Sequence, residues 1–92
     1  MALAERLTDD YNAALRAGED VRKATLRLLR AAIRNAEIEQ RAPLDDAAVL
    51  RVLQAQAKQR RDSIALYEQG GRMDLVAGET AELAIIEGYL PA

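Results

Sequence analysis

The stretch DDAAVLRVLQAQAKQRRDSIALYEQ, residues 45–69, decides the fold that the sequence predicts. The apolar residues that recur along it at helical spacing are Val49, Leu53, Ile64 and Tyr67. This spacing places them on one face of a long helix. Arg60 falls in the same register, so a cation lies inside an otherwise apolar stripe. Two interpretations are open: Arg60 is paired at a helix interface, or it faces a ligand outside the chain.

The remainder of the chain has the same helical periodicity and shows no alternation typical of strands. Gly18 suits a left-handed cap at the end of a first helix, and Asp20 is a good N-cap for a second. Pro43 predicts a turn before Asp45, the expected N-cap of the long helix. The sequence therefore predicts an all-α domain of four helices over residues 2–17, 20–40, 45–69 and 72–88.

The second predicted helix has two distinct faces. Its expected buried face consists of Thr25, Leu26, Leu28, Leu29, Ala32, Ile33 and Ala36. The opposite face is basic, and we call it the basic ridge: it holds Lys23, Arg27, Arg30, Arg34 and, if the helix reaches it, Arg41. Such a ridge tracks nucleic-acid phosphates in some proteins and is simply a solvated face in others.

Gly70 and Gly71 end the long helix, so the third and fourth predicted helices form an antiparallel hairpin, with the first two helices packed against it. A residue ten positions before such a turn faces one about ten positions after it. This geometry predicts an ion pair between Arg60 and Glu79.

Composition excludes several classes of function. The chain contains no Cys and no His, which removes disulfides, thiol nucleophiles, imidazole proton shuttles and the usual zinc sites. Lys and Arg number 13 against 15 Asp and Glu, so a net charge of -2 gives no global attraction to nucleic acid or to anionic membranes. No apolar run approaches the roughly 20 residues of a membrane span. The start of the chain turns charged too early for a signal peptide, which favours a cytoplasmic protein.

Motifs for catalysis are not found either. Gly70–Gly71–Arg72 lacks the spacing and the preceding strand of a phosphate-binding loop. Lys58 lies five residues before Ser63, which puts a potential amine base and hydroxyl nucleophile on different helix faces. The sequence therefore predicts no catalytic residue, no metal site and no cofactor.

Four short motifs, which we call the sequence words, resemble the GatB/YqeY family, and they span most of the chain. They are LLRAAIRNAEI at 28–38, KQRRDSI at 58–64, GRMDLV at 71–76 and EGYLP at 87–91. The resemblance implies a helical domain related to the C-terminal region of the GatB component of the glutamine-dependent aminoacyl-tRNA amidotransferase, a carbon-nitrogen ligase. In that enzyme the glutaminase and kinase chemistry lie in other regions, and this region helps to hold tRNA.

Family members usually continue past the Tyr-Leu-Pro word into a smaller helical module. We expect residues 1–92 to form a single domain that corresponds to the N-terminal part of YqeY-like proteins, without that module. Its expected role is that of a non-catalytic accessory domain whose partner is tRNA or an amidotransferase-type complex. The alternative is a protein-interaction or scaffold module. The residues expected to contact RNA are Arg27, Arg30, Arg34, Lys58, Arg61 and Arg72.

Overall fold

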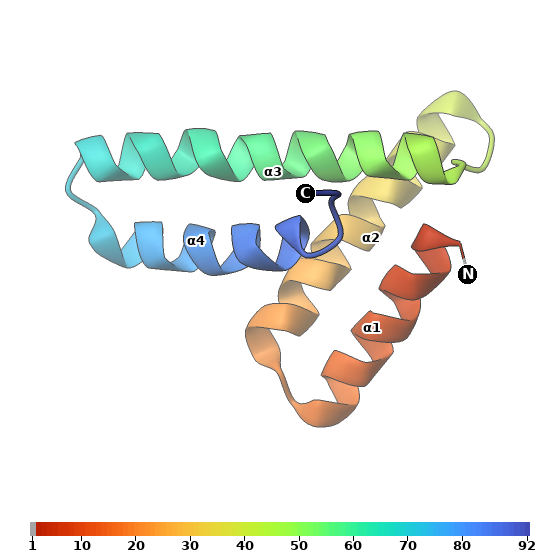
Figure 1. Cartoon of the computed structure of the whole chain (residues 1–92), viewed down its shortest axis with the longest axis horizontal. Helices are drawn as coiled ribbons and strands as arrows, with labels where there is room; N and C mark the ends of the chain where they lie inside the picture. Colours follow the sequence, from red (N-terminus) through yellow and green to blue (C-terminus); the bar gives the residue numbers. More distant parts are fainter. Residues whose placement is uncertain (1) are drawn as a thin grey trace. The chain divides into compact units, whose positions relative to one another are not determined.

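The computed structural model describes residues 2–92, and within them the chain forms four helices and no strand. The helices are α1 (Leu3–Ala17), α2 (Asp20–Gln40), α3 (Asp46–Gln69) and α4 (Met73–Glu87). The all-α, four-helix prediction is confirmed, and each predicted boundary agrees with the structure to within one residue. Figure 1 shows the order of the helices along the chain.

The turns between the helices are formed by residues that cap the helix ends. Gly18 follows α1 in the left-handed conformation, with φ 70°, as predicted. Asp45 caps α3, because its carboxylate accepts a hydrogen bond of 2.8 Å from the backbone N–H of Ala48. The expected cap at Asp20 is wrong: Asp20 is already the first residue of α2, and the residue before it, Glu19, makes no side-chain capping bond.

The chain divides into two compact units, and the boundary falls inside the continuous helix α3. The first unit extends to Val52, and the second is Leu53–Ala92. The prediction of a single domain over the whole length stays a prediction.

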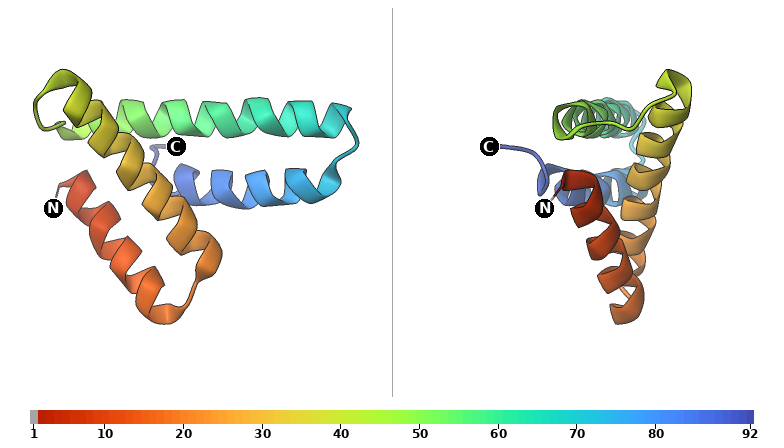
Figure 2. Two further views of the ribbon diagram at one scale, coloured as in Figure 1. Left: turned by 180° about the vertical axis from the view of Figure 1, so that it is seen from behind. Right: turned by 90° about the vertical axis from the view of Figure 1, so that its right-hand side faces the viewer.

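In the first unit, α1 and α2 run antiparallel and contact each other, as two further views also show (Figure 2). The start of α3 is joined to the start of α1 by a hydrogen bond of 3.0 Å from the Leu3 backbone N–H to the Asp46 carboxylate. The buried apolar residues of this unit are Leu7, Ala14, Leu26, Leu29, Ile33 and Val49.

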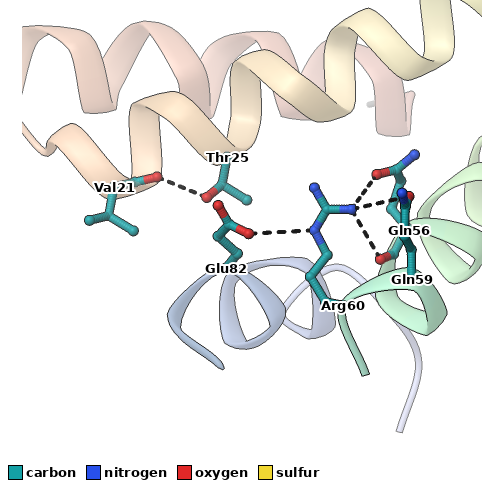
Figure 3. Close-up of polar contacts among 6 residues, drawn as sticks. All are labelled: Val21, Thr25, Gln56, Gln59, Arg60 and Glu82. Carbon is teal, nitrogen blue, oxygen red and sulfur yellow. Dashed lines mark hydrogen bonds and ion pairs between the residues drawn. The ribbon is translucent and has the colours of Figure 1, made fainter. Parts of the chain in front are cut away.

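One residue of the expected core of α2 lies outside it. Leu28 is 39% exposed, whereas Thr25, Leu26, Leu29 and Ile33 are buried. The buried residues centre on the side of the helix that carries Leu26 and Leu29, and at 100° per residue Leu28 lies more than a quarter turn away from that centre. The hydroxyl of Thr25 donates a hydrogen bond of 2.8 Å to the Val21 carbonyl, which satisfies this buried polar group (Figure 3).

In the second unit, the rest of α3 and α4 form the predicted antiparallel hairpin (Figure 1). Gly71 adopts φ 70° at the turn, where a side chain would be strained. The backbone N–H of Arg72 donates to the Tyr67 carbonyl at 2.9 Å and closes the end of α3. The buried residues of this unit are Leu53, Ala57, Arg60, Ile86 and Tyr89.

α4 differs from the other helices because apolar residues surround it rather than forming one stripe. Ile86 is its one fully buried side chain among the residues that the structure describes, while Met73 and Leu75 are exposed. No helix within residues 2–92 has the length and apolar character required to cross a bilayer.

Candidate nucleic-acid interface

The basic ridge lies on α2, about a third of a turn around the helix from the centre of the buried face, so the prediction that it lies opposite that face is wrong. Arg27 and Arg34 are exposed and Arg30 is half-buried. The ammonium group of Lys23 lies 3.5 Å from the Asp20 carboxylate, so its charge is partly compensated. Arg41 lies just beyond the helix as its left-handed cap, with φ 57°, and so leaves the helical register of the other four.

Tyr11, on α1, is the residue that organises two of the ridge arginines. Its hydroxyl oxygen accepts hydrogen bonds from Arg27 Nη2 at 3.0 Å and from Arg27 Nε at 3.4 Å. The guanidinium carbon of Arg30 lies over the Tyr11 ring, 4.7 Å from its centroid, and that of Arg27 lies 5.7 Å from it. Both contacts are within the range of cation–π attraction.

This environment is electropositive. The hydrogen bond from Arg27 lowers the pKa of Tyr11 below its ordinary value of 10.0, and the charges of Arg27, Arg30 and Lys23 act in the same direction. Desolvation of the hydroxyl opposes them only in part. Three cations therefore lie near the Tyr11 hydroxyl, and such a grouping favours the binding of an anion.

The predicted RNA contacts of the second unit have a different electrostatic character. Lys58 Nζ forms an ion pair with Asp62 at 2.7 Å. Arg72 donates two hydrogen bonds to Asp74, at 3.1 and 3.2 Å, and this pairing lowers the pKa of Asp74. Arg61 is exposed. Two of these three cations are therefore neutralised by their own helix or turn.

Arg60 is buried, with 8% of its side chain exposed (Figure 3). Its Nη1 donates to the side-chain oxygen of Gln56 at 2.7 Å and more weakly to that of Gln59 at 3.4 Å. Its Nε lies 3.6 Å from the carboxylate of Glu82. At this distance the two groups form an ion pair but no hydrogen bond, and within residues 2–92 Nε has no hydrogen-bond acceptor.

The acidic partner of Arg60 is therefore Glu82, where Glu79 was expected. Arg60 and Glu82 each lie eleven residues from Gly71, so they face each other across a hairpin centred on that glycine. Glu79 lies one helical turn closer to the turn of the hairpin. It still feels the charge of Arg60, but burial and the neighbouring Glu82 carboxylate have the larger influence and raise its pKa above the ordinary value of 4.5.

No other feature of the described residues indicates a catalytic or metal centre. They contain no group of three or more acidic residues placed to hold a metal ion. A shallow hollow next to the ridge is lined by Arg34, Glu37, Ile38, Ala42 and Pro43. Glu37 is engaged there, because its carboxylate accepts a hydrogen bond from the Leu44 backbone N–H at 3.1 Å.

Sequence reasoning missed Tyr11 as part of the interface, because its partners Arg27 and Arg30 lie on another helix. A signal for it does exist. Tyr11 and Arg27 lie eight residues before and after Glu19, which follows the Gly18 cap. Residues at equal distances before and after a turn between two antiparallel helices face each other, as Arg60 and Glu82 do about Gly71. The same count places Tyr11 opposite Arg27.

Comparison with known proteins supports the family resemblance. A family model described as "Yqey-like protein" matches residues 4–92, which confirms the resemblance seen in the four sequence words. Three relatives are named "Altered inheritance of mitochondria protein 41, mitochondrial". The protein of Eremothecium gossypii is 39% identical over 94% of this chain and 48% of its own length. The Lachancea thermotolerans protein is 39% identical over 91% of this chain and 46% of its own length. The Kluyveromyces lactis protein is 36% identical over 94% of this chain and 47% of its own length.

Two consequences follow from these relatives. The chain spans about half the length of the curated relatives it matches. The predicted cytoplasmic location is contradicted, because the relatives are named as mitochondrial proteins. The prediction rested on a test for a secretory signal peptide, and that test does not separate cytoplasmic from mitochondrial proteins.

Proposed function

The chain belongs to the YqeY-like protein family, and from this premise we propose that it is a non-catalytic, tRNA-associated accessory domain. The proposal follows the relationship to the amidotransferase that the sequence words imply. In this role the domain binds RNA or a tRNA-amidotransferase-type complex, and any amide-forming chemistry belongs to other polypeptide regions.

The observation that carries the proposal is the unequal pairing of cations. Within residues 2–92, Arg27, Arg30 and Arg34 have no carboxylate partner at ion-pair distance, whereas Lys58 and Arg72 each have one. An arginine that is already paired must give up its carboxylate to bind a phosphate, so it gains little from doing so. The basic ridge therefore supports phosphate binding better than Lys58 and Arg72 do.

The chemistry of the ridge favours binding over catalysis. Arginine side chains donate hydrogen bonds in a fixed planar fork and accept none. This fork matches the oxygens of a phosphate group, which is why arginine is over-represented at phosphate sites. Contacts of this kind are independent of base sequence and depend strongly on salt.

A second candidate function is supported by α4. Apolar side chains lie around this helix, and Leu66, Met73 and Leu75 near the turn of the hairpin are 67%, 61% and 36% exposed. Exposed apolar side chains that are grouped near one turn can mark a protein-interaction site. This observation favours a protein-interaction module, which is compatible with an accessory role and does not require RNA.

A titration separates the two functions. Fluorescently labelled tRNA is titrated with the 92-residue chain, and anisotropy is measured at several salt concentrations from about 20 to 200 mM. If three arginines contact phosphates, the logarithm of the association constant falls with the logarithm of salt concentration with a slope of about -2 to -3. Absence of binding at the lowest salt would contradict the RNA proposal and leave the protein-interaction candidate.

A further inference from the structure

We infer that Tyr11 is a positioning residue of a phosphate site on α2: it holds Arg27 and Arg30 so that Arg30 and Arg34 present their N–H groups to an RNA phosphodiester. The inference rests on the proposed function, which it extends by naming the contacting arginines and the residue that orders them. The sequence words and the comparisons do not assign any role to Tyr11.

The two arginines that touch Tyr11 are held in different ways. Arg27 directs both Nε and Nη2 at the Tyr11 hydroxyl, so one edge of its guanidinium fork is occupied. Arg30 is held by the ring, with its guanidinium carbon 4.7 Å from the centroid. Among residues 2–92 no hydrogen-bond acceptor is found for the Arg30 guanidinium.

This difference decides which arginine is free to bind. The N–H bonds of a guanidinium lie in its plane, so a ring packed over the guanidinium leaves those donors directed outward. Arg30 therefore keeps its full set of donors while its position is restrained. Arg27 shapes the site and contributes charge, but it has fewer donors left for a ligand.

Arg34 completes the site from the same helix. It follows Arg30 by four residues, a spacing at which side chains are neighbours on a helix surface, with Cβ atoms about 5–6 Å apart. Arg34 is exposed and has no ion-pair partner among residues 2–92. Two guanidinium groups at this spacing suit the oxygens of one phosphodiester or of two adjacent ones.

Restraint by Tyr11 matters because long side chains lose rotamer freedom when a ligand fixes them. A side chain that is already held in the free protein loses less, and the affinity rises accordingly. The positive surroundings that lower the pKa of Tyr11 are consistent with an anion site at this position. Within the described residues, Arg27, Arg30 and Arg34 have no carboxylate at ion-pair distance.

The test compares two substitutions of Tyr11 with a control. Tyr11→Leu removes both the ring and the hydroxyl, and we expect tRNA affinity to fall about fivefold, the range of a cation–π contact at an exposed site together with a lost hydrogen bond. Tyr11→Phe keeps the ring over both arginines and removes only the hydrogen bonds from Arg27 to the hydroxyl, so we expect a loss of about twofold or less. Tyr67→Leu, at a half-buried tyrosine of the second unit, is the matched control and should retain wild-type affinity.

A spectroscopic readout keeps the inference testable even if Tyr11→Leu folds poorly. In wild-type protein with labelled tyrosine rings, addition of tRNA should shift the NMR signals of Tyr11 and leave those of Tyr67 in place. A purely structural role for Tyr11 would not produce this selective shift.

The outcomes distinguish this inference from the function on which it rests. If the wild-type chain binds tRNA while both Tyr11 variants bind equally well and the Tyr11 signals do not move, the positioning role is wrong and the RNA proposal stands. If the wild-type chain does not bind tRNA at low salt, the proposed function itself fails. Affinity that rises in the order Tyr11→Leu, Tyr11→Phe and wild type, with a selective Tyr11 shift, supports both.

Discussion

At the scale of single residues, the buried charge of Arg60 decides the polar chemistry of the hairpin. A buried guanidinium must be paired and hydrogen-bonded to offset its desolvation. Gln56 provides the shortest hydrogen bond and Glu82 the compensating charge (Figure 3). Glu79 adds a second carboxylate nearby, and one guanidinium then faces two acids. Burial of the Glu79 carboxyl and this excess of negative charge raise its pKa.

Replacing each glutamate with glutamine should therefore change the free energy of unfolding in opposite directions. The pKa of Glu79 is higher in the folded state than in the unfolded chain. Above this raised pKa the ionised Glu79 carboxylate therefore lowers the free energy of unfolding. Below the ordinary value of 4.5 Glu79 is protonated in both states, and this destabilisation disappears. Glu79→Gln should raise the free energy of unfolding at pH 7 by less than about 1 kcal/mol, since solvent screens the group. The gain should vanish below about pH 4, as measured by urea unfolding at both pH values.

Glu82→Gln is the control for this measurement. It removes the negative partner of Arg60 and should lower stability at pH 7 by about 1 kcal/mol. If the two substitutions changed stability at pH 7 in the same direction, the assignment of Glu82 as the partner of Arg60 would be wrong.

At the scale of helices, the turns could be predicted because the sequence marks them with residues of special conformation. Gly18, Pro43 and Gly71 each lie where a helix ends or a turn forms, and the helix boundaries follow from them. What could not be predicted was the register between facing helices. A shift of one helical turn exchanges Glu79 for Glu82, and periodicity alone does not fix that shift. The same limit hid Tyr11, whose partners lie on another helix.

Two glycines of the hairpin offer a prediction at this scale. Gly78 lies inside α4 and has open space where a Cβ would be, so Gly78→Ala should raise the free energy of unfolding by about 1 kcal/mol. Gly71 also has open space but adopts φ 70°, so Gly71→Ala should lower it by about 1 kcal/mol. Thermal unfolding measures both, with shifts of about 5 °C in opposite directions. A stabilised Gly71→Ala variant would show that the turn does not need its left-handed residue.

At the scale of the whole molecule, the net charge does not show how the cations are distributed over the chain. The chain carries -2 overall, so no long-range attraction draws it to RNA. Pairing instead separates five of the six predicted RNA contacts into two groups, while Arg61 is exposed and has no ion-pair partner among residues 2–92. Lys58 and Arg72 are compensated by neighbouring aspartates, whereas Arg27, Arg30 and Arg34 of the basic ridge are not. The sequence pointed to all six predicted RNA contacts alike, and only side-chain geometry ranks them.

The most direct test of the central claim compares two charge reversals of equal size. One variant carries Arg27→Glu, Arg30→Glu and Arg34→Glu on the basic ridge, and the other carries Lys58→Glu, Arg61→Glu and Arg72→Glu. Both change the net charge equally, and circular dichroism confirms that each remains helical. We predict that tRNA binding at low salt is lost in the ridge variant and largely retained in the other. Equal losses, or loss confined to the Lys58, Arg61 and Arg72 variant, would contradict the assignment of RNA contact to α2.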